Sequence, residues 1–160
     1  MRISVAAVGR LKTGAEKSLA ADYFERTQGL CRKAGITKIA ITELQESRAA
    51  EAKLRLADEG AALAAAVPPQ AFRIVLDERG KAMTSEAFTD LIRKRQQEAT
   101  ADLAFLIGGP DGHSPQIRDS SNLLMAFGPA TWPHRLVRIM LLEQIYRAVT
   151  IMVNHPYHRP

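Results

Sequence analysis

Residues 103–112 read Leu-Ala-Phe-Leu-Ile-Gly-Gly-Pro-Asp-Gly, five apolar residues followed directly by a glycine-rich turn. An apolar run this short, bounded by glycine and proline, is typical of a strand that is buried on both faces. Such strands occur in parallel sheets that are covered by helices. The segment therefore predicts a central strand of an α/β fold, with a loop at its carboxyl end.

On either side of this strand, short apolar runs alternate with longer segments of helical periodicity. The predicted strands are residues 3–8, 36–42, 72–76, 103–107 and 123–127, the third stopping at the charged run 77–79. The predicted helices are residues 16–34, 47–66, 85–99, a short one near 114–115, and 133–153. This alternation predicts an α/β fold with a mostly parallel sheet and helices on both faces. No linker or repeat interrupts it, so residues 1–160 are predicted to form a single domain.

The composition is that of an ordinary globular protein with a small excess of positive charge. The chain has 160 residues, of which 24% are charged, and a net charge of +5. A basic balance weakly favours a polyanionic partner. Cys31 is the only cysteine, which excludes an intramolecular disulfide and a cysteine-based metal site. The sequence shows no signal peptide and no apolar stretch of roughly 20 residues, so we expect a cytoplasmic protein that does not enter membranes.

Three predicted strands end in segments that suit a ligand site. They are residues 76–77, 107–112 and 127–133, and the last two carry glycines, which let a ligand approach the backbone. The glycine turn matches neither the GxGxxG dinucleotide motif nor the GxxxxGK[ST] phosphate loop, and it can also be read as a simple tight turn. Trp132 can line an adenine site by apolar contact, or it can be a core or interface aromatic.

The last predicted helix is apolar over most of its circumference. One stripe comprises Val137, Leu141, Ala148 and Met152, and the other comprises Ile139, Leu142, Tyr146 and Val149. A helix of this kind must be buried on two sides. In a chain this small we expect one side to belong to a second subunit, which predicts a homodimer. Glu143 and Arg147 are expected to form an ion pair at that interface.

The final seven residues are rich in groups that can serve chemistry or RNA binding. His155, Tyr157, His158 and Arg159 can stack on bases, contact phosphates or exchange protons. An ordinary frayed terminus is the alternative. Two histidines without further ligands do not make a metal site, so we expect no metal.

Four motifs in a fixed order resemble one known family. They are residues 106–112 (Leu-Ile-Gly-Gly-Pro-Asp-Gly), 133–138 (Pro-His-Arg-Leu-Val-Arg), 143–148 (Glu-Gln-Ile-Tyr-Arg-Ala) and the closing His-Pro-Tyr-His-Arg. Over its whole length the chain resembles the ribosomal RNA large subunit methyltransferase H family of the SPOUT superfamily. The resemblance implies a C-terminal trefoil knot, a homodimer, and S-adenosylmethionine as the methyl donor. The implied reaction is methylation of N3 of a pseudouridine in the helix 69 loop of 23S ribosomal RNA, in the assembled ribosome.

The resemblance also implies roles for individual residues. It places around the cofactor Leu76, Gly108, Gly109, Phe127, Gly128, Pro129, Ala130, Thr131 and Trp132. N3 of pseudouridine carries a proton at neutral pH and must lose it; His155, Tyr157 or His158 could assist, or water could suffice. Arg138 is expected to stabilise the developing anion, and Arg135 and Arg159 are expected to contact the RNA.

Two other classes of protein fit part of the sequence. A non-catalytic ribosome-binding module would bind RNA without binding a cofactor. A nucleotide-dependent oxidoreductase would need a phosphate-binding turn, which the sequence lacks. Binding of S-adenosylmethionine separates these three classes.

Overall fold

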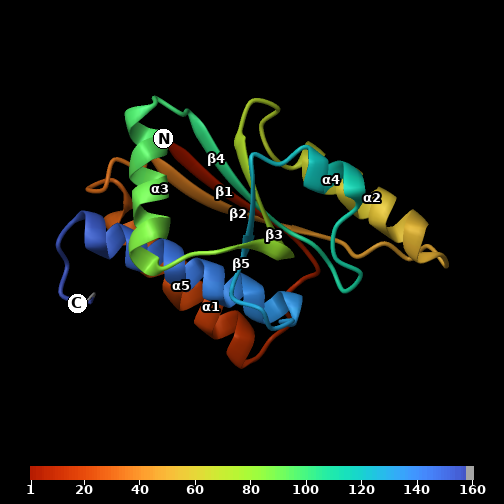
Figure 1. Ribbon diagram of the computed structural model, residues 1–160. Coiled ribbons are helices and arrows are strands. Elements are labelled where there is room, and N and C mark those ends of the chain that lie inside the picture. The colour runs from red at the N-terminus through yellow and green to blue at the C-terminus, as the bar shows by residue number, and fades with distance from the viewer. Residues whose placement is uncertain (158–160) are drawn as a thin grey trace.

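Figure 1 shows a computed structural model of the chain, which describes residues 1–157. A five-stranded sheet forms its centre. The strands are β1 (Arg2–Val8), β2 (Lys38–Leu44), β3 (Phe72–Ala82), β4 (Asp102–Ile107) and β5 (Leu123–Ala126). All neighbouring strands pair in parallel, and the order across the sheet is β2-β1-β4-β3-β5. The predicted α/β class and parallel sheet are confirmed.

Helices cover both faces of the sheet, as predicted. They are α1 (Ala15–Cys31), α2 (Ala52–Ala65), α3 (Ser85–Gln97), α4 (Pro115–Asp119) and α5 (His134–Met152). Helices α1, α3 and α5 lie on one face, and α2 and α4 lie on the other (Figure 1). The connections through α1 and α3 run toward the β2 edge, whereas those through α2 and α4 run toward the β5 edge. Because such crossovers are right-handed, the two directions place their helices on opposite faces.

Alternate residues of the strands fill two apolar layers. In β1, Ile3 and Val5 face the layer under α1, α3 and α5, whereas Ala6 and Val8 face the layer under α2 and α4. This is the alternation expected of a strand that is covered on both faces. All six residues of β4 are buried, which explains why its sequence is an almost continuous apolar run.

The helix boundaries follow the local signals closely. The Thr84 side chain caps α3 by accepting a hydrogen bond from the Ala87 amide at 3.2 Å. Ser114 caps α4 in the same way, with Pro115 in the first turn. Helix α1 ends at Cys31, three residues earlier than predicted, and Gly35 adopts a positive φ of 73° just beyond it.

Strand β3 is longer than predicted. It was expected to stop at Leu76, but after a register shift it pairs again with β5 through Lys81 and Ala82. Gly80 makes this return possible, because a Cβ atom there would lie 2.5 Å from the backbone of Met125. The charged run 77–79 therefore does not end the strand, as was predicted, but lies within an irregular strand.

Much of both apolar stripes of α5 is buried within one chain. The helix packs against α1, α3 and the sheet, and Leu141, Leu142, Ala148 and Val149 are each at most 1% exposed. Val137 and Met152 of the first stripe are only partly buried, so the expectation that a second subunit covers one stripe stays a prediction. The homodimer and the trefoil knot stay predictions. Among the described helices, none is both long and apolar enough to cross a membrane.

Candidate functional site

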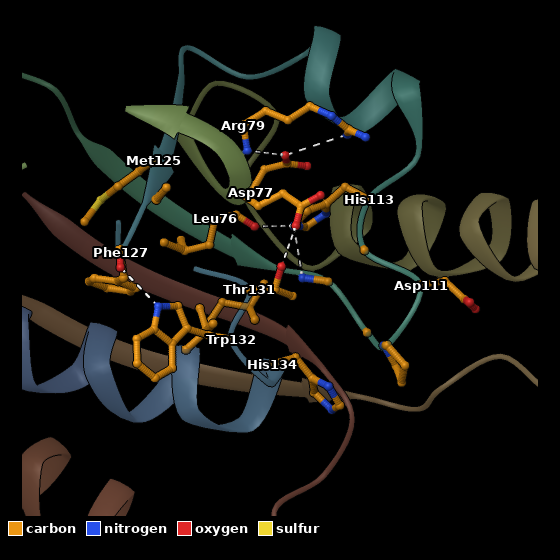
Figure 2. Close-up of a pocket in the computed structure, with 18 of the residues that line it drawn as sticks. Leu76, Asp77, Arg79, Asp111, His113, Met125, Phe127, Thr131, Trp132 and His134 are labelled. Atoms are coloured by element: carbon orange, nitrogen blue, oxygen red, sulfur yellow. Dashed lines mark hydrogen bonds and ion pairs between the residues drawn. The ribbon is translucent and has the colours of Figure 1, made fainter. Parts of the chain in front are cut away.

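A cavity of about 850 Å³ opens at the carboxyl ends of β3, β4 and β5 (Figure 2). This edge of a parallel sheet is where ligands bind in open α/β folds. The cavity brings together eight of the nine predicted cofactor residues, namely Leu76, Gly108, Gly109, Phe127, Gly128, Ala130, Thr131 and Trp132. Pro129 does not line it. The first turns of α4 and α5 complete the wall with Pro115, Arg118, His134 and Val137.

His113 stands where β3 and β4 separate. Leu76 and Ile107 form the last pair of their ladder, and His113 Nε2 lies 3.1 Å from the Leu76 carbonyl oxygen. The same Nε2 lies 3.0 Å from the amide nitrogen of Gly108. Burial lowers the pKa of His113, so the ring is neutral at neutral pH. A neutral ring nitrogen either accepts from Gly108 or donates to Leu76, which leaves the other backbone group available to a ligand.

The two glycines of the loop after β4 are required by the packing of the loop itself. A Cβ atom on Gly108 would lie 2.4 Å from the carbonyl oxygen of Gly112. A Cβ atom on Gly109 would lie 2.9 Å from Glu59 Oε2 and 3.0 Å from a methyl group of Val8. Since these atoms belong to the protein, the glycines serve the fold of the loop in addition to any close approach by a ligand.

The loop is also held from the side of α2. Arg55 donates to the carboxylate of Asp111 with an Nε–Oδ2 distance of 2.6 Å, and its hydrogen bond holds the pKa of Asp111 below the usual value. Glu59 is buried behind the loop, and burial raises the pKa of its carboxyl group. Sequence reasoning missed these supports because they join positions about 50 residues apart.

The segment after β5 forms the opposite wall of the cavity. The Trp132 indole nitrogen donates to the Phe127 carbonyl oxygen at 3.1 Å, and the Thr131 hydroxyl donates to Glu78 at 3.2 Å. Gly128 has a positive φ of 92°, which lets the chain turn between the two. The indole is 44% exposed, so Trp132 is a surface wall and not a core aromatic.

His134 is a cavity residue to which the sequence assigned no role. It begins α5, beside Trp132, and its side chain is 18% exposed. Its Nε2 is buried without a hydrogen-bond partner among the described residues and lies 3.9 Å from Glu46 Oε1. Burial lowers the pKa of His134. The motif at residues 133–138 marked this position, but only the fold shows that it lies in the cavity.

Arg138 does not face the site, contrary to expectation. Its side chain is 2% exposed, and it donates to Glu43 Oε1 at 2.5 Å and to the Gly9 carbonyl oxygen at 2.7 Å. It does not line the cavity, and its hydrogen bonds tie α5 to β2 and to the end of β1, so the predicted role in stabilising the developing anion is not supported by its position. Arg135, on the same helix, remains 43% exposed and lies 3.8 Å from Glu16.

The described part of the tail lies outside the cavity. The Tyr157 hydroxyl donates to Glu143 at 3.1 Å, and its ring lies 4.6 Å from that of Tyr146. Burial raises the pKa of the Tyr157 phenol, which keeps it protonated at neutral pH. The imidazole of His155 accepts from the Tyr157 amide. The side chain of Tyr157 therefore lies beside the middle of α5, and none of residues 154–157 lines the cavity.

The remaining predictions for the tail and for metals have separate outcomes. His158 and Arg159 lie outside the described residues, so their predicted roles stay predictions. Glu143 and Arg147 form the predicted ion pair at 2.6 Å. Within residues 1–157, no group of three or more histidine, cysteine, aspartate or glutamate side chains is placed to hold a metal ion.

The chain is similar to known proteins over nearly its whole length. A family model described as "Predicted SPOUT methyltransferase" matches residues 1–158. A ribosomal RNA large subunit methyltransferase H of Bradyrhizobium diazoefficiens is 48% identical over 159 residues, 99% of each chain. The protein of that name from Rhodopseudomonas palustris is 49% identical over the same share of both chains. The solved SpoU methyltransferase AviRb of Streptomyces viridochromogenes, in complex with AdoMet, matches with a TM-score of 0.40 and 10% identity, over 96% of this chain and 61% of that one.

Proposed function

The chain belongs to the SPOUT methyltransferase family, and on that premise we propose that it methylates large-subunit ribosomal RNA with S-adenosylmethionine as the methyl donor. The observation that carries the proposal is the end-to-end match, over 99% of both chains, to relatives named for that activity. We extend it to one target, N3 of a pseudouridine in the helix 69 loop of 23S ribosomal RNA in the assembled ribosome.

The cavity suits S-adenosylmethionine in size and in chemistry. Its volume of about 850 Å³ lies within the range of roughly 300–1,000 Å³ that is usual for small-molecule sites. Met125, Phe127 and Trp132 offer apolar surface for an adenine. The Leu76 carbonyl and the Gly108 amide offer hydrogen bonds, one of which His113 leaves available. We propose that these groups hold the cofactor.

The reaction asks the protein mainly for positioning. A sulfonium carries a good leaving group, so the nitrogen needs to be placed in line with the methyl group and freed of its proton. Arg135, which is half-exposed on the first turn of α5 beside the cavity, is the described residue that we propose to contact RNA. Arg159 has the same proposed role.

The position of the tail supports a site that is shared between two subunits. None of the described tail residues 154–157 lines the cavity of its own chain. We propose that the tail of a second copy approaches that cavity. Leu19, Trp132 and Leu136 are large apolar residues left 38–45% exposed near the start of α5, a surface that suits such a second copy. We propose a homodimer in which His155, His158 and Arg159 serve the partner's site.

The remaining features of the proposal concern the whole chain. Residues 1–160 form one domain with a C-terminal trefoil knot. The protein acts in the cytoplasm, because that is where its proposed ribosomal substrate is found.

The proposal is tested by methylation of ribosomes that lack this modification. We expect transfer of a labelled methyl group from S-adenosylmethionine to assembled ribosomes, with little transfer to deproteinised 23S RNA. Mass spectrometry of the helix 69 fragment should place the methyl group on N3 of pseudouridine. A protein that binds ribosomes but neither binds S-adenosylmethionine nor transfers methyl groups would be a binding module, and the proposal would fail.

A further inference from the structure

We infer that His134, oriented by Glu46, is the proton acceptor for the nitrogen that is methylated. The inference rests on the proposed function and adds to it the residue that removes the proton. The family resemblance left the choice of proton acceptor open between His155, Tyr157, His158 and water.

The geometry around His134 is that of a base with an orienting carboxylate. The ring lines the cavity beside Trp132, at the first turn of α5 (Figure 2). Its Nε2 is turned away from solvent and faces Glu46 Oε1 at 3.9 Å. Nδ1 has no hydrogen-bond partner among the described residues and is not buried, so we assign it to the substrate. General-base histidines place one nitrogen near a carboxylate and the other on the substrate; at 3.9 Å the Glu46 contact is too long for a hydrogen bond, and such contacts often tighten only when substrate binds.

Gly9 is the third member of this arrangement. A Cβ atom on Gly9 would lie 2.9 Å from Glu46 Oε1 and 3.2 Å from His134 Nε2. Its carbonyl oxygen also accepts a hydrogen bond from Arg138, which fixes the backbone at this point. The loop after β1 therefore holds open the space in which the imidazole and the carboxylate meet.

The charges around the ring leave it in the form that a base needs. Burial lowers the pKa of His134, so the ring is neutral and able to accept a proton at neutral pH. The charged groups that face it are Glu46 after β2, Glu16 of α1, and Arg135 and Arg138 of α5. The two carboxylates raise its pKa and the two arginines lower it.

The other candidates in the described chain are less well placed. Tyr157 does not line the cavity of its own chain, its hydroxyl is engaged with Glu143, and its phenol has a raised pKa. His113 uses Nε2 between Leu76 and Gly108, and its Nδ1 is buried without a partner among the described residues. His134 is the less buried of the two histidines that line the cavity, with a side chain that is 18% exposed, and is therefore easier for a substrate to reach.

The proposed step balances in atoms and electrons. His134 Nδ1 takes the proton from N3, whose electron pair forms the bond to the methyl carbon of the sulfonium. The bond between that carbon and sulfur breaks, and its electron pair stays on sulfur in S-adenosylhomocysteine. The products are the N3-methylated base, the thioether and a protonated His134, which then releases its proton to water.

The first experiment measures the carboxylate contact without reference to activity. Nuclear magnetic resonance of the full-length protein gives the pKa of His134 in the wild type and in Glu46→Gln. Because Glu46 raises that pKa, its removal should lower it by at least about 0.5 pH unit. Glu16→Gln is the matched control, since Glu16 is engaged with Arg135 and should have a smaller effect. An unchanged value in Glu46→Gln would show that Glu46 does not orient the ring.

The second experiment measures the chemical step. Single-turnover methylation of ribosomes should fall by at least about 100-fold in His134→Gln, the scale expected when a general base is lost. In the wild type the rate should fall as the pH drops through the pKa of His134, and Glu46→Gln should move that fall to lower pH. A His134→Gln protein that reacts at close to the wild-type rate with an unchanged pH profile would overturn the inference.

Binding of S-adenosylhomocysteine separates this inference from the proposed function. Calorimetry on the wild type should show binding, and its absence would count against the proposed function. His134→Gln should still bind, because the lost group acts on the base and not on the cofactor. If circular dichroism shows that His134→Gln does not fold, His134→Asn replaces it. The pH dependence of the wild-type rate tests the inference without any substitution.

Discussion

Gly108 and Gly112 differ in what an added methyl group would meet, although both belong to the loop after β4. A Cβ atom on Gly108 would strike the backbone of Gly112 at 2.4 Å, and backbone cannot move aside cheaply. At Gly112 nothing lies within 4 Å, and only the positive φ of 82° opposes a side chain. A substitution at Gly108 therefore tests the effect of a steric clash within the loop, and one at Gly112 tests the effect of backbone strain alone.

We expect Gly108→Ala to abolish binding of S-adenosylhomocysteine, because the loop must open to relieve the clash. Gly112→Ala should cost about 1 kcal/mol of stability, the usual penalty for a left-handed residue, and should retain binding. Calorimetry gives the affinities, and thermal unfolding gives the stabilities. Normal binding by Gly108→Ala would mean that the loop adjusts freely and does not shape the cavity.

At the scale of elements, Arg138 ties α5 to two strands. Its guanidinium reaches Glu43 on β2 and the carbonyl oxygens of Val8 and Gly9 at the end of β1. Burial lowers the pKa of Arg138, while Glu43 opposes this effect. This contact sets the position of the first turn of α5, and with it the positions of His134 and Trp132.

We predict that Glu43→Gln lowers the free energy of unfolding by about 2–3 kcal/mol, because it leaves a buried guanidinium without its counter-charge. Urea unfolding of the wild type and the variant measures the change. Asp22→Asn is the matched control, because it breaks an exposed ion pair with Arg26 on α1 and should alter stability little. If both substitutions lower the free energy of unfolding equally, Glu43 does not stabilise the fold more than an exposed ion pair does.

At the scale of the whole molecule, the proposed function places residues of two chains around one complete site. The sedimenting species should have about twice the 17.6 kDa chain mass. The mass alone does not show sharing, so the two halves of the site must be inactivated on different chains. A cut after Tyr157 removes the last three residues and keeps the contacts of Tyr157 with Glu143 and Tyr146.

We predict that this truncated chain stays folded and binds S-adenosylhomocysteine, and that its methylation of ribosomes falls by at least about 100-fold. The second chain carries Ala130→Trp, which should fill the cavity without disturbing the core, because Ala130 is an exposed cavity residue. Verified heterodimers should regain activity, since one site then combines an open cavity with an intact tail. Full activity of the truncated homodimer, or no recovery in the heterodimer, would end the shared-site proposal.

Features that depend on neighbouring residues along the chain were predictable from the sequence. Short apolar runs predicted the five strands, three of which are followed directly by a glycine. The side chains of Thr84 and Ser114 cap the helices that follow them, because capping is decided within one turn. The order of elements predicted the parallel sheet, and that sheet brought the ends of β3, β4 and β5 to one edge. Most of the cavity wall was therefore predictable.

Which side chains are available to that cavity depends on contacts that form when the chain folds. Arg138 was expected to stabilise the developing anion and is instead buried in an ion pair with Glu43, which lies 95 residues earlier in the chain. Much of the apolar stripes of α5, which predicted a subunit interface, is covered by α1, α3 and the sheet. His113 and His134 gained their places from contacts with Leu76 and Glu46. Burial and charge pairing are set by contacts between distant segments of the chain. An apolar helix face indicates that something covers it, but not which element or subunit does so.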